Sequence, residues 1–405
     1  MLTLDSLDFS GKRVFVRVDL NSPYDEKTGS IEKSPRLVAH CRTLKELSSK
    51  KAKVVVLAHQ GRKGDPDCIS LSQHAKLLGE ELKRQVKFVP DVCGQPAKDA
   101  ISSLGNGKIL LLENVRFLED ETKCKTLEEA ANSLLVRELS PQCDIFVLDA
   151  FSVSHRPHAS VVGFFSKPCV AGRVMQEELS ALSKVKNPAR PLVFLFGGAK
   201  PDDSLGILEG WLAEGKVDTA LATGVLGELF VLASGKELGK TTDFLKSTKA
   251  IDHLSHVREI SDKYKGKILI PTDFAVDENG VRKEISVRKL PSEFSILDVG
   301  KKTVSLYSKT IKDAKTIIVN GPVGVYEKDE FSYGTKKLLK AVEKASSLGA
   351  FSLLGGGHTI SALSKFRIKK KKLGYVSLSG KALIEYLGGA KLAGVELLLR
   401  EQTPQ

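Results

Sequence analysis

Residues 191–200 read PLVFLFGGAK, a continuous apolar run that ends in two glycines and a lysine. Strands that are buried on both faces of a sheet have this pattern, whereas half-exposed strands alternate apolar and polar residues. Two glycines let a ligand approach the backbone closely, and Lys200 adds a point charge suited to phosphate. The stretch therefore predicts a parallel strand, covered by helices, with an anion site at its carboxyl end.

The same pattern recurs along the chain, separated by longer segments with apolar residues at helical spacing. Such spacing is clear over Leu71–Arg84 and Thr126–Leu139. Strands that alternate with helices form βαβ units, so we expect an α/β fold built on parallel sheets. The expected strands are Arg13–Val18, Lys53–Ala58, Lys108–Leu112, Asp144–Leu148, Pro191–Phe196, Thr219–Thr223, Lys267–Pro271, Thr316–Val319 and Phe351–Leu354.

The residues that follow these runs change character near the middle of the chain. Before about Gly172 they are arginines and histidines, and after Pro191 they are glycines. Between them, Gly172–Lys186 has the pattern of an amphipathic helix that ends at Asn187-Pro188. We therefore expect a first lobe over 1–171, a connecting helix over 172–190 and a second lobe over 191–387.

Composition excludes several classes of protein. The 405 residues are 41% hydrophobic and 27% charged, as in soluble globular proteins, and no apolar run is long enough to span a membrane. The first residues lack the layout of a signal peptide, and the six cysteines form no CxxC pair. We expect a cytoplasmic monomer that does not bind membranes.

The chain is basic, with 62 Lys and Arg residues against 49 Asp and Glu residues and a formal charge of +13. Such a balance raises nucleic acid as a partner, but that function requires clustered basic residues with aromatics among them. Aromatic residues make up only 6% of the chain, and its arginines follow strands, so we expect no nucleic-acid partner. The basic run Arg367–Lys372 is typical of a solvated loop or helix end.

Five arginines lie in or near the turns that follow strands of the first lobe. One such arginine alone would be a surface or ion-pair residue. Five in similar positions favour bidentate recognition of a small, multiply charged anion. Asp19 and Asn21, in the same turns, would hold a hydroxyl group or orient an arginine, whereas His158 is expected to be a packed or capping residue. The arginines are Arg17, Arg36, Arg62, Arg116 and Arg156.

Glycines take the corresponding positions in the second lobe. The turn Gly355–Thr359 precedes a helical segment, so its backbone N–H groups would form an anion site at a helix N-terminus. Thr223-Gly224 and Asn320-Gly321-Pro322 follow two other expected strands. The chain has neither the GxxxxGK[ST] nor the GxGxxG pattern, which disfavours a P-loop enzyme and a dinucleotide-dependent dehydrogenase.

In order, these segments resemble phosphoglycerate kinases, and the variant glycine turn resembles that of the archaeal branch. The likeness covers nearly the whole chain. It rests on RVDLNSP (17–23), AHQGR (58–62), LLENVRF (111–117), DAFSVSHRPHAS (149–160), FGGAK (196–200), VNGPVGVYE (319–327) and LLGGGHT (353–359).

The resemblance implies two Rossmann-like lobes, each a parallel sheet covered by helices, joined by an interdomain helix, with a C-terminal segment (388–405) that returns to the first lobe. It implies reversible phosphoryl transfer from 1,3-bisphosphoglycerate to ADP, giving 3-phosphoglycerate and ATP, in line and on lobe closure, with Mg²⁺ carried on the nucleotide. Neither acceptor, an ADP phosphate or an ionised carboxylate, needs a protein base, which fits the absence of a catalytic triad from the sequence.

The resemblance also assigns residues. Arg36 and Lys200 are the expected catalytic groups, which neutralise charge on the transferring phosphoryl group. The acid substrate is assigned to Asp19, Asn21, Arg36, His59, Arg62, Arg116 and Arg156. The nucleotide is assigned to Gly197, Gly198, Lys200, Gly224, Asn320, Pro322, Glu327, Gly355, Gly356, Gly357, His358 and Thr359.

Three positions depart from the family pattern. Ser204 replaces a second lysine, and His358 replaces a metal-binding aspartate; histidine is a poor Mg²⁺ ligand. The metal ligands stay open, with Asp202, Asp203 or another acid as candidates. The third departure places Lys381 in a late glycine element, and we hypothesise that it partly replaces the lysine missing at 204. An inactive relative that retains only the fold is the alternative interpretation.

Overall fold

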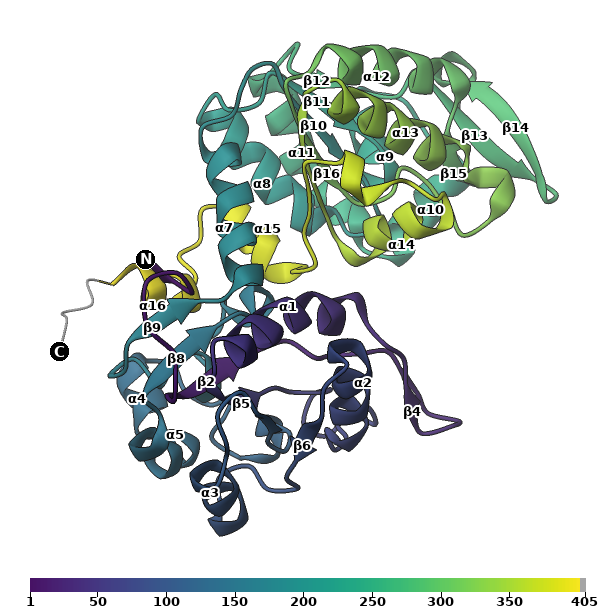
Figure 1. Cartoon of the computed structure of the whole chain (residues 1–405). Coiled ribbons are helices and arrows are strands. Elements are labelled where there is room, and N and C mark those ends of the chain that lie inside the picture. The colour runs from purple at the N-terminus through teal and green to yellow at the C-terminus, as the bar shows by residue number, and fades with distance from the viewer. Residues whose placement is uncertain (401–405) are drawn as a thin grey trace. The chain divides into compact units, whose positions relative to one another are not determined.

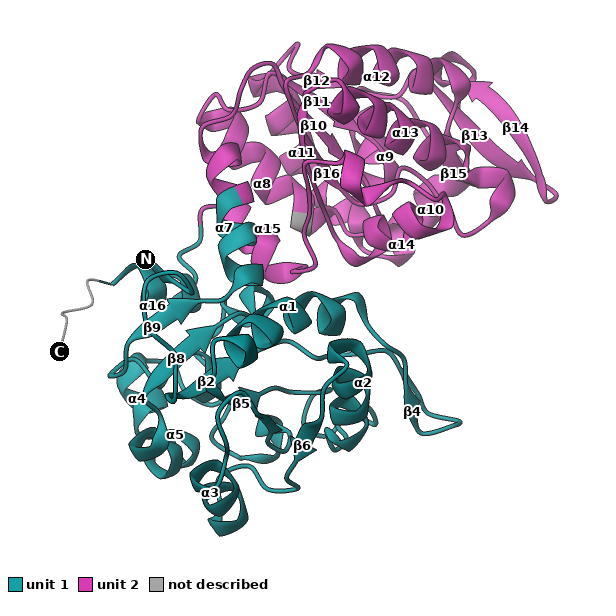
Figure 2. Cartoon of the chain, viewed as in Figure 1, with its two compact units in different colours: residues 1–180, 390–405 teal, residues 181–389 magenta. Residues whose placement is uncertain are grey.

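The computed structural model describes residues 1–400, apart from the side chain of Asp203. The chain forms two compact units, one made of 1–180 with 390–405 and the other of 181–389 (Figure 2). Helix α7 (Arg173–Lys186) contains the position at which the first unit gives way to the second. Each unit is an α/β structure built on a parallel sheet, which confirms the predicted fold class.

The first unit is built on a sheet in which seven of the described strands pair in parallel, in the order β1-β9-β8-β2-β5-β7-β6 (Figure 1). All four strands expected in this half are present; β1, β6 and β9 are only two or three residues long and were not foreseen. The bounds are β1 Leu2–Thr3, β2 Arg13–Arg17, β5 Lys53–Leu57, β6 Val86–Phe88, β7 Ile109–Leu111, β8 Ile145–Leu148 and β9 Cys169–Ala171.

Side chains pack against both faces of this sheet. Helices α1 (Pro35–Ser49) and α2 (Ser72–Leu82) share a core with Val14 and Val16 of β2. On the other face, the ring centroid of Phe164 lies 5.6 Å from that of Phe15 and 5.1 Å from that of Phe146. Because both faces are buried, every position of these strands favours an apolar residue, which explains the continuous hydrophobic runs.

The expected helix over Thr126–Leu139 is in fact two helices. Ser133 interrupts it, because its side chain accepts a hydrogen bond from the backbone N–H of Val136 and so begins a new helix. The hairpin strands are β3 Tyr24–Asp25 and β4 Ser30–Ile31, and the other helices of this unit are α3 Gln95–Ser102, α4 Leu127–Ala131, α5 Leu134–Leu139, α6 Ala159–Val162 and α16 Ala393–Leu399.

The second unit has its own parallel sheet, in which six described strands follow the order β12-β11-β10-β16-β17-β18. The strands are β10 Leu192–Phe196, β11 Thr219–Ala222, β12 Ile268–Leu269, β16 Thr316–Asn320, β17 Phe351–Gly355 and β18 Tyr375–Val376. The helices are α8 Pro201–Ala213, α9 Gly224–Ala233, α10 Lys240–Ser247, α11 Leu254–Lys263, α12 Lys301–Asp313, α13 Tyr333–Ser347, α14 Gly357–Lys365 and α15 Lys381–Leu387.

An antiparallel sheet in the second unit was not foreseen. Its strands are β13 (Asp273–Glu278), β14 (Val281–Ser286) and β15 (Ile296–Val299), with β13 in the middle. The outer strand β14 reads VRKEIS and is largely exposed, so it lacks the apolar run by which the other strands were recognised.

Two general expectations can be compared with the structure. The six cysteines, all within the described residues, are free thiols. Among residues 1–400, no helix combines the length and the apolar character needed to cross a lipid bilayer.

Candidate active site

Four adjacent strands of the first unit deliver the charged residues that the sequence singles out. The strands β8, β2, β5 and β7 are neighbours and parallel, so their carboxyl ends lie along one edge of the sheet. The loops at this edge carry residues predicted to bind the acid: Asp19 and Asn21 after β2, His59 and Arg62 after β5, Arg116 after β7, and Arg156 after β8.

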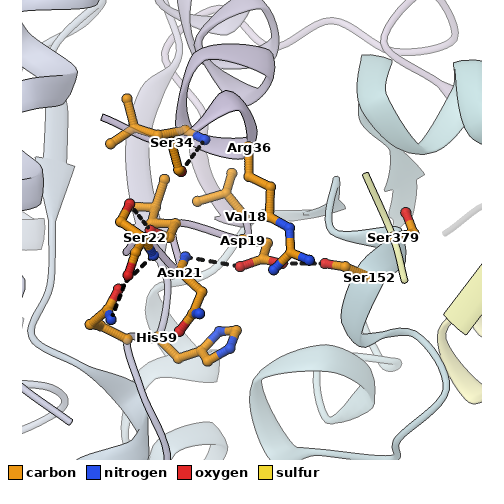
Figure 3. Close-up of polar contacts among 12 residues, drawn as sticks. Val18, Asp19, Asn21, Ser22, Ser34, Arg36, His59, Ser152 and Ser379 are labelled. Carbon is orange, nitrogen blue, oxygen red and sulfur yellow. Dashed lines mark hydrogen bonds and ion pairs between the residues drawn. The ribbon is translucent and has the colours of Figure 1, made fainter. Parts of the chain in front are cut away.

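Arg36 is brought to the same edge by helix α1. Ser34 caps this helix by accepting a hydrogen bond from the N–H of Leu37, which places Arg36 in the first turn. The Arg36 guanidinium lies 3.1 Å from the Asp19 carboxylate (Figure 3). Of the two roles left open for Asp19, the structure supports the orientation of an arginine.

Asp19 is ionised in spite of its burial. Burial alone would raise its pKa, but the Arg36 charge and hydrogen bonds from the Ser152 hydroxyl and the Asn21 N–H hold the pKa well below its usual value. The Asn21 side chain in turn accepts a hydrogen bond of 2.8 Å from the Gly61 N–H, which ties the loop after β2 to the loop after β5.

A buried chain of hydrogen bonds holds the backbone of Asp19, and its residues were not expected from the sequence. The backbone N–H of Asp19 donates to Nε2 of His40 over 3.1 Å, so Nδ1 of that ring donates to Asp149 over 2.7 Å. The other oxygen of Asp149 accepts from the N–H of Val174, in the first turn of α7. The start of α7 is thus connected by hydrogen bonds to the loop after β2, whose Asp19 pairs with Arg36.

The Arg17 side chain is fully buried, so it holds neighbouring residues in place and is not exposed to a ligand. Its Nε donates to the Ser160 hydroxyl over 2.7 Å, and its guanidinium lies 3.1 Å from Nδ1 of His59. The buried carboxyl of Glu121 accepts hydrogen bonds from the Ser160 N–H and hydroxyl. Burial raises the pKa of Glu121 to about 7, although the Arg17 charge acts in the opposite direction.

Burial and neighbouring arginines shift the pKa values of several groups at this edge. Burial, followed by the charges of Arg17 and Arg156, lowers the pKa of Arg116 to about 10. Burial and nearby arginines also lower the pKa of His158 to about 3 and hold the pKa of His59 well below its usual value. A bound anion would relieve the repulsion that Arg17 and Arg156 exert on Arg116.

The remaining predicted residues of this unit differ in exposure. Arg62 is exposed and Arg156 is half-buried, so both have access to a ligand. Arg116 is largely buried and donates to the carbonyl of Gly61. His158 is buried at the N-cap of α6 and forms no side-chain cap, as expected of a packed residue.

In the second unit, three of the predicted glycine turns meet in one hydrogen-bonded junction. The N–H of Gly198 donates to the carbonyl of Pro322 over 2.7 Å, and the N–H of Gly224 donates to that of Val323 over 3.0 Å. A Cβ atom on Gly197 would lie 2.2 Å from the Pro322 oxygen, and one on Gly321 would lie 2.4 Å from the Gly197 oxygen. Backbones this close leave no room for side chains, which is why glycine is required here.

Asn320 and Thr359 hold this junction with their side chains. The Asn320 amide donates to the hydroxyl of Ser204 over 2.9 Å, and the Thr359 hydroxyl accepts from the Gly321 N–H over 3.0 Å. Ser204 is buried. The residue that departs from the family pattern at 204 therefore fixes Asn320.

The triple-glycine turn leads into a helix as predicted. Gly355 ends β17, Gly356 is the N-cap residue with φ of +92°, and α14 begins at Gly357. His358 follows, and its Nδ1 lies 3.5 Å from a Glu327 carboxylate oxygen, with both side chains exposed. The imidazole is thus paired with an acid.

A cavity of about 300 Å³ lies beside the junction. Five residues predicted to bind the nucleotide line it. Its walls are largely apolar and include Val225, Phe244 and Ile296. Apolar cavities with a few polar groups are typical small-molecule sites. The five residues are Gly198, Gly224, Pro322, Glu327 and His358.

The other predicted nucleotide residues do not line the cavity. Lys200 is exposed at the N-cap of α8, and the remaining residues lie at the ends of β10, β16 and β17 and in the first turn of α14. Asp202, in the first turn of α8, pairs with His253 over 3.0 Å, and Asp203 as a metal ligand falls outside the described side chains. Within the described residues, no three His, Cys, Asp or Glu side chains gather as a metal site would require.

Two charged residues of this unit lie outside the junction, and the sequence singled out only the first of them, Lys381. Lys381 is exposed, begins α15 and lies 3.4 Å from Glu385 of the same helix. Glu228, in the middle of the apolar helix α9, lines the cavity although it was not singled out. A carboxylate within the apolar stretch TGVLGELFVL was the available signal, because buried carboxylates are rare.

Comparison with known proteins gives one consistent result. The family model described as phosphoglycerate kinase matches residues 4–390. A phosphoglycerate kinase of Methanosarcina mazei is 43% identical over 98% of this chain and 94% of its own, and one of Methanothermobacter thermautotrophicus is 40% identical over 99% and 97%. The crystal structure of the Pyrococcus horikoshii phosphoglycerate kinase superimposes with a TM-score of 0.90 at 36% identity and covers 98% of both chains.

Proposed function

The chain belongs to the phosphoglycerate kinase family, and on that premise we propose how its residues share the two substrates. The family interconverts 1,3-bisphosphoglycerate and ADP with 3-phosphoglycerate and ATP, a transfer in glycolysis that has a carboxyl group as acceptor. We assign the phosphoglycerate to the first unit and the nucleotide to the second, in a cytoplasmic monomer.

The observation that carries the first assignment is the crowding of cations at one sheet edge. Beside burial, the charges of Arg17 and Arg156 depress the pKa of Arg116, and the anionic groups of phosphoglycerate would remove this repulsion. Exposed Arg62 would complete the contacts to the ligand. Bidentate arginine contacts suit phosphate and carboxylate groups equally well.

The glycine junction and its cavity support the second assignment. The N-terminus of α14 offers backbone N–H groups to phosphates, and the apolar cavity beside it suits a flat base. Mg²⁺ takes oxygen ligands and keeps several waters, so one or two carboxylates such as Asp202 and Glu327 fit an ion that arrives on the nucleotide. When bound, Mg²⁺ would neutralise phosphate charge.

Transfer itself requires position and charge rather than a base. The Asp19 carboxylate and the cap of α1 fix Arg36, so its guanidinium is oriented before the phosphoryl group arrives. Lys200 supplies a second positive charge beside the glycine turn of the nucleotide unit. That the two lobes close for the in-line transfer stays a prediction.

The variant Arg62→Ala tests the assignment of the acid site. We expect the KM for 3-phosphoglycerate to rise roughly 10- to 100-fold, because a charge-assisted contact is lost, while the KM for ATP stays unchanged. The neighbouring variant Lys63→Ala is the control, since Lys63 is engaged by Glu119 on the surface. Equal effects of both variants, or a change in the KM for ATP, would overturn the assignment. A wild-type protein with no transfer activity would establish the alternative of an inactive relative.

Lys381→Ala tests whether this residue replaces the lysine that is missing at 204. If Lys381 contacts the phosphates during turnover, its loss should lower kcat about tenfold, the effect expected of one charge-assisted hydrogen bond. Lys371→Ala, which removes an exposed lysine of the same unit, controls for net charge. An unchanged kcat for Lys381→Ala would reduce this lysine to the helix partner of Glu385.

A further inference from the structure

One carboxyl group in the cavity has no described function. Glu228 lies one helical turn after Gly224 on α9, and both residues line the cavity beside the glycine junction. The Glu228 side chain is more than nine-tenths buried, and its Oε2 atom has no hydrogen-bond partner among the described residues. An unsatisfied buried oxygen destabilises a fold, so its presence in a ligand cavity calls for a partner that arrives with the ligand.

Among the side chains that the structure describes, no cation acts on the pKa of Glu228. Burial is the sole identified cause acting on its pKa, which is raised to about 8. The other titratable groups at the cavity are engaged with one another or with the backbone. Asp298 on β15 accepts from Arg282 and from two backbone N–H groups, and Glu327 faces His358.

On the elements packed against α9, the charged side chains named below are exposed or paired with other residues, as is Asp298 of β15. Helix α11 turns Val257 and Ile260 inward and carries Arg258 and Glu259 on its exposed side. On α8, Asp202 pairs with His253 and Glu209 with His256. Strand β11 carries no charged residue, and Asp252 of the turn η4 (Ala250–His253) is exposed. At neutral pH the Glu228 carboxyl is therefore protonated and can both donate and accept a hydrogen bond.

We propose that the Glu228 carboxyl hydrogen-bonds the polar edge of the purine base and sets the relative use of adenine and guanine nucleotides. This inference rests on the proposed assignment of the nucleotide to the cavity. A neutral carboxyl matches adenine, because its O–H donates to N1 while its other oxygen accepts from the 6-amino group. It also matches guanine, by donating to O6 and accepting from N1–H.

Ionisation of Glu228 separates the two bases. A carboxylate only accepts hydrogen bonds, so it loses the contact with N1 of adenine. Guanine instead offers two adjacent donors, N1–H and the 2-amino group, to the two oxygens of the carboxylate. Adenine thus requires the protonated form, whereas guanine is accepted by either form, and the preference for adenine falls as the pH rises through about 8.

The experiment measures 3-phosphoglycerate-dependent transfer with ATP and with GTP between pH 6.5 and 8.5. In the wild-type protein, the ratio of kcat/KM for ATP to that for GTP should fall about fourfold, as one ionisation near pH 8 requires. In Glu228→Gln the ratio should not change with pH, because an amide donates and accepts at every pH. In Glu228→Leu both KM values should rise while the melting temperature stays at or above that of wild type, because the orphaned oxygen is gone.

The pocket-filling variant Val325→Trp tests the assignment of the nucleotide to the cavity separately from the role of Glu228. Val325 lines the cavity and is partly exposed, so a larger side chain can be placed there without disturbing the core. A rise of at least tenfold in the KM for both nucleotides supports the cavity as the base site. If that result is obtained, the role of Glu228 alone would be overturned in either of two cases. The ratio of kcat/KM for ATP to that for GTP would not change with pH in the wild-type protein, or it would change equally in Glu228→Gln. Unchanged KM values in Val325→Trp would overturn the assignment itself.

Discussion

Arg36→Ala is expected to lower kcat about 10²- to 10³-fold, the effect measured when one preorganised donor to transition-state charge is removed. The Asp19 carboxylate, 3.1 Å away, fixes the guanidinium before substrate binds. The transition state of phosphoryl transfer spreads charge over the equatorial oxygens, so losing a fixed cation affects the transition state more than the ground state. The effect should therefore appear mainly in kcat.

Two further variants make this expectation specific. Arg36→Lys retains the charge but loses the planar fork, so it should recover only part of the activity. Arg42→Ala, on the same helix, removes an exposed arginine that pairs with Glu177 over 2.6 Å, and it should behave as wild type. If Arg36→Ala raised only the KM for 3-phosphoglycerate and left kcat unchanged, Arg36 would be a binding residue without a role in transfer.

Gly224→Ala is expected to raise the KM for ADP about 100-fold and to destabilise the second unit by about 1–3 kcal/mol. Gly224 has φ of +56°, and a Cβ atom there would lie 2.7 Å from both the N and the O of Gly198. The added methyl group would therefore push apart the hydrogen-bonded turns of the junction, beside the cavity in which the nucleotide is proposed to bind. Measurements of KM for both substrates and urea unfolding together test this expectation.

Gly206→Ala is the matched control for this substitution. Gly206 lies in α8, where a Cβ atom would have no neighbour within 4 Å, so alanine should be neutral or slightly stabilising. The KM for 3-phosphoglycerate should stay unchanged in both variants. A Gly224→Ala protein that binds ADP normally would show that the junction tolerates expansion and is not part of the nucleotide site.

The sequence predicted the central strands well because their environment is uniform. Runs such as LVFLF in β10 are buried on both faces, so each residue carries the same signal. The outer strand β14 carries charged residues and lacks an apolar run, so it was missed, although the Asn279-Gly280 turn that joins it to β13 is a local hairpin signal in the sequence. The helix expected over Thr126–Leu139 failed for a local reason, the cap at Ser133.

For the candidate site, the sequence identified the residues that project from strand ends but not those that hold them. Asp19 and Arg36 were found through their motifs, whereas His40 and Asp149 act through contacts between residues 109 positions apart in sequence. Glu228 was missed for a different reason. The rest of its helix is largely apolar, and its proposed role becomes visible only from the cavity that it lines.

The most direct test is a crystal structure of the protein with 3-phosphoglycerate and Mg²⁺·ADP. We expect the phosphoglycerate at the carboxyl ends of β2, β5, β7 and β8, in contact with Arg62 and Arg156, and the purine base in the cavity beside Glu228. A nucleotide bound at the arginine-rich edge of the first unit, or a base outside the cavity, would contradict the division of substrates between the two units.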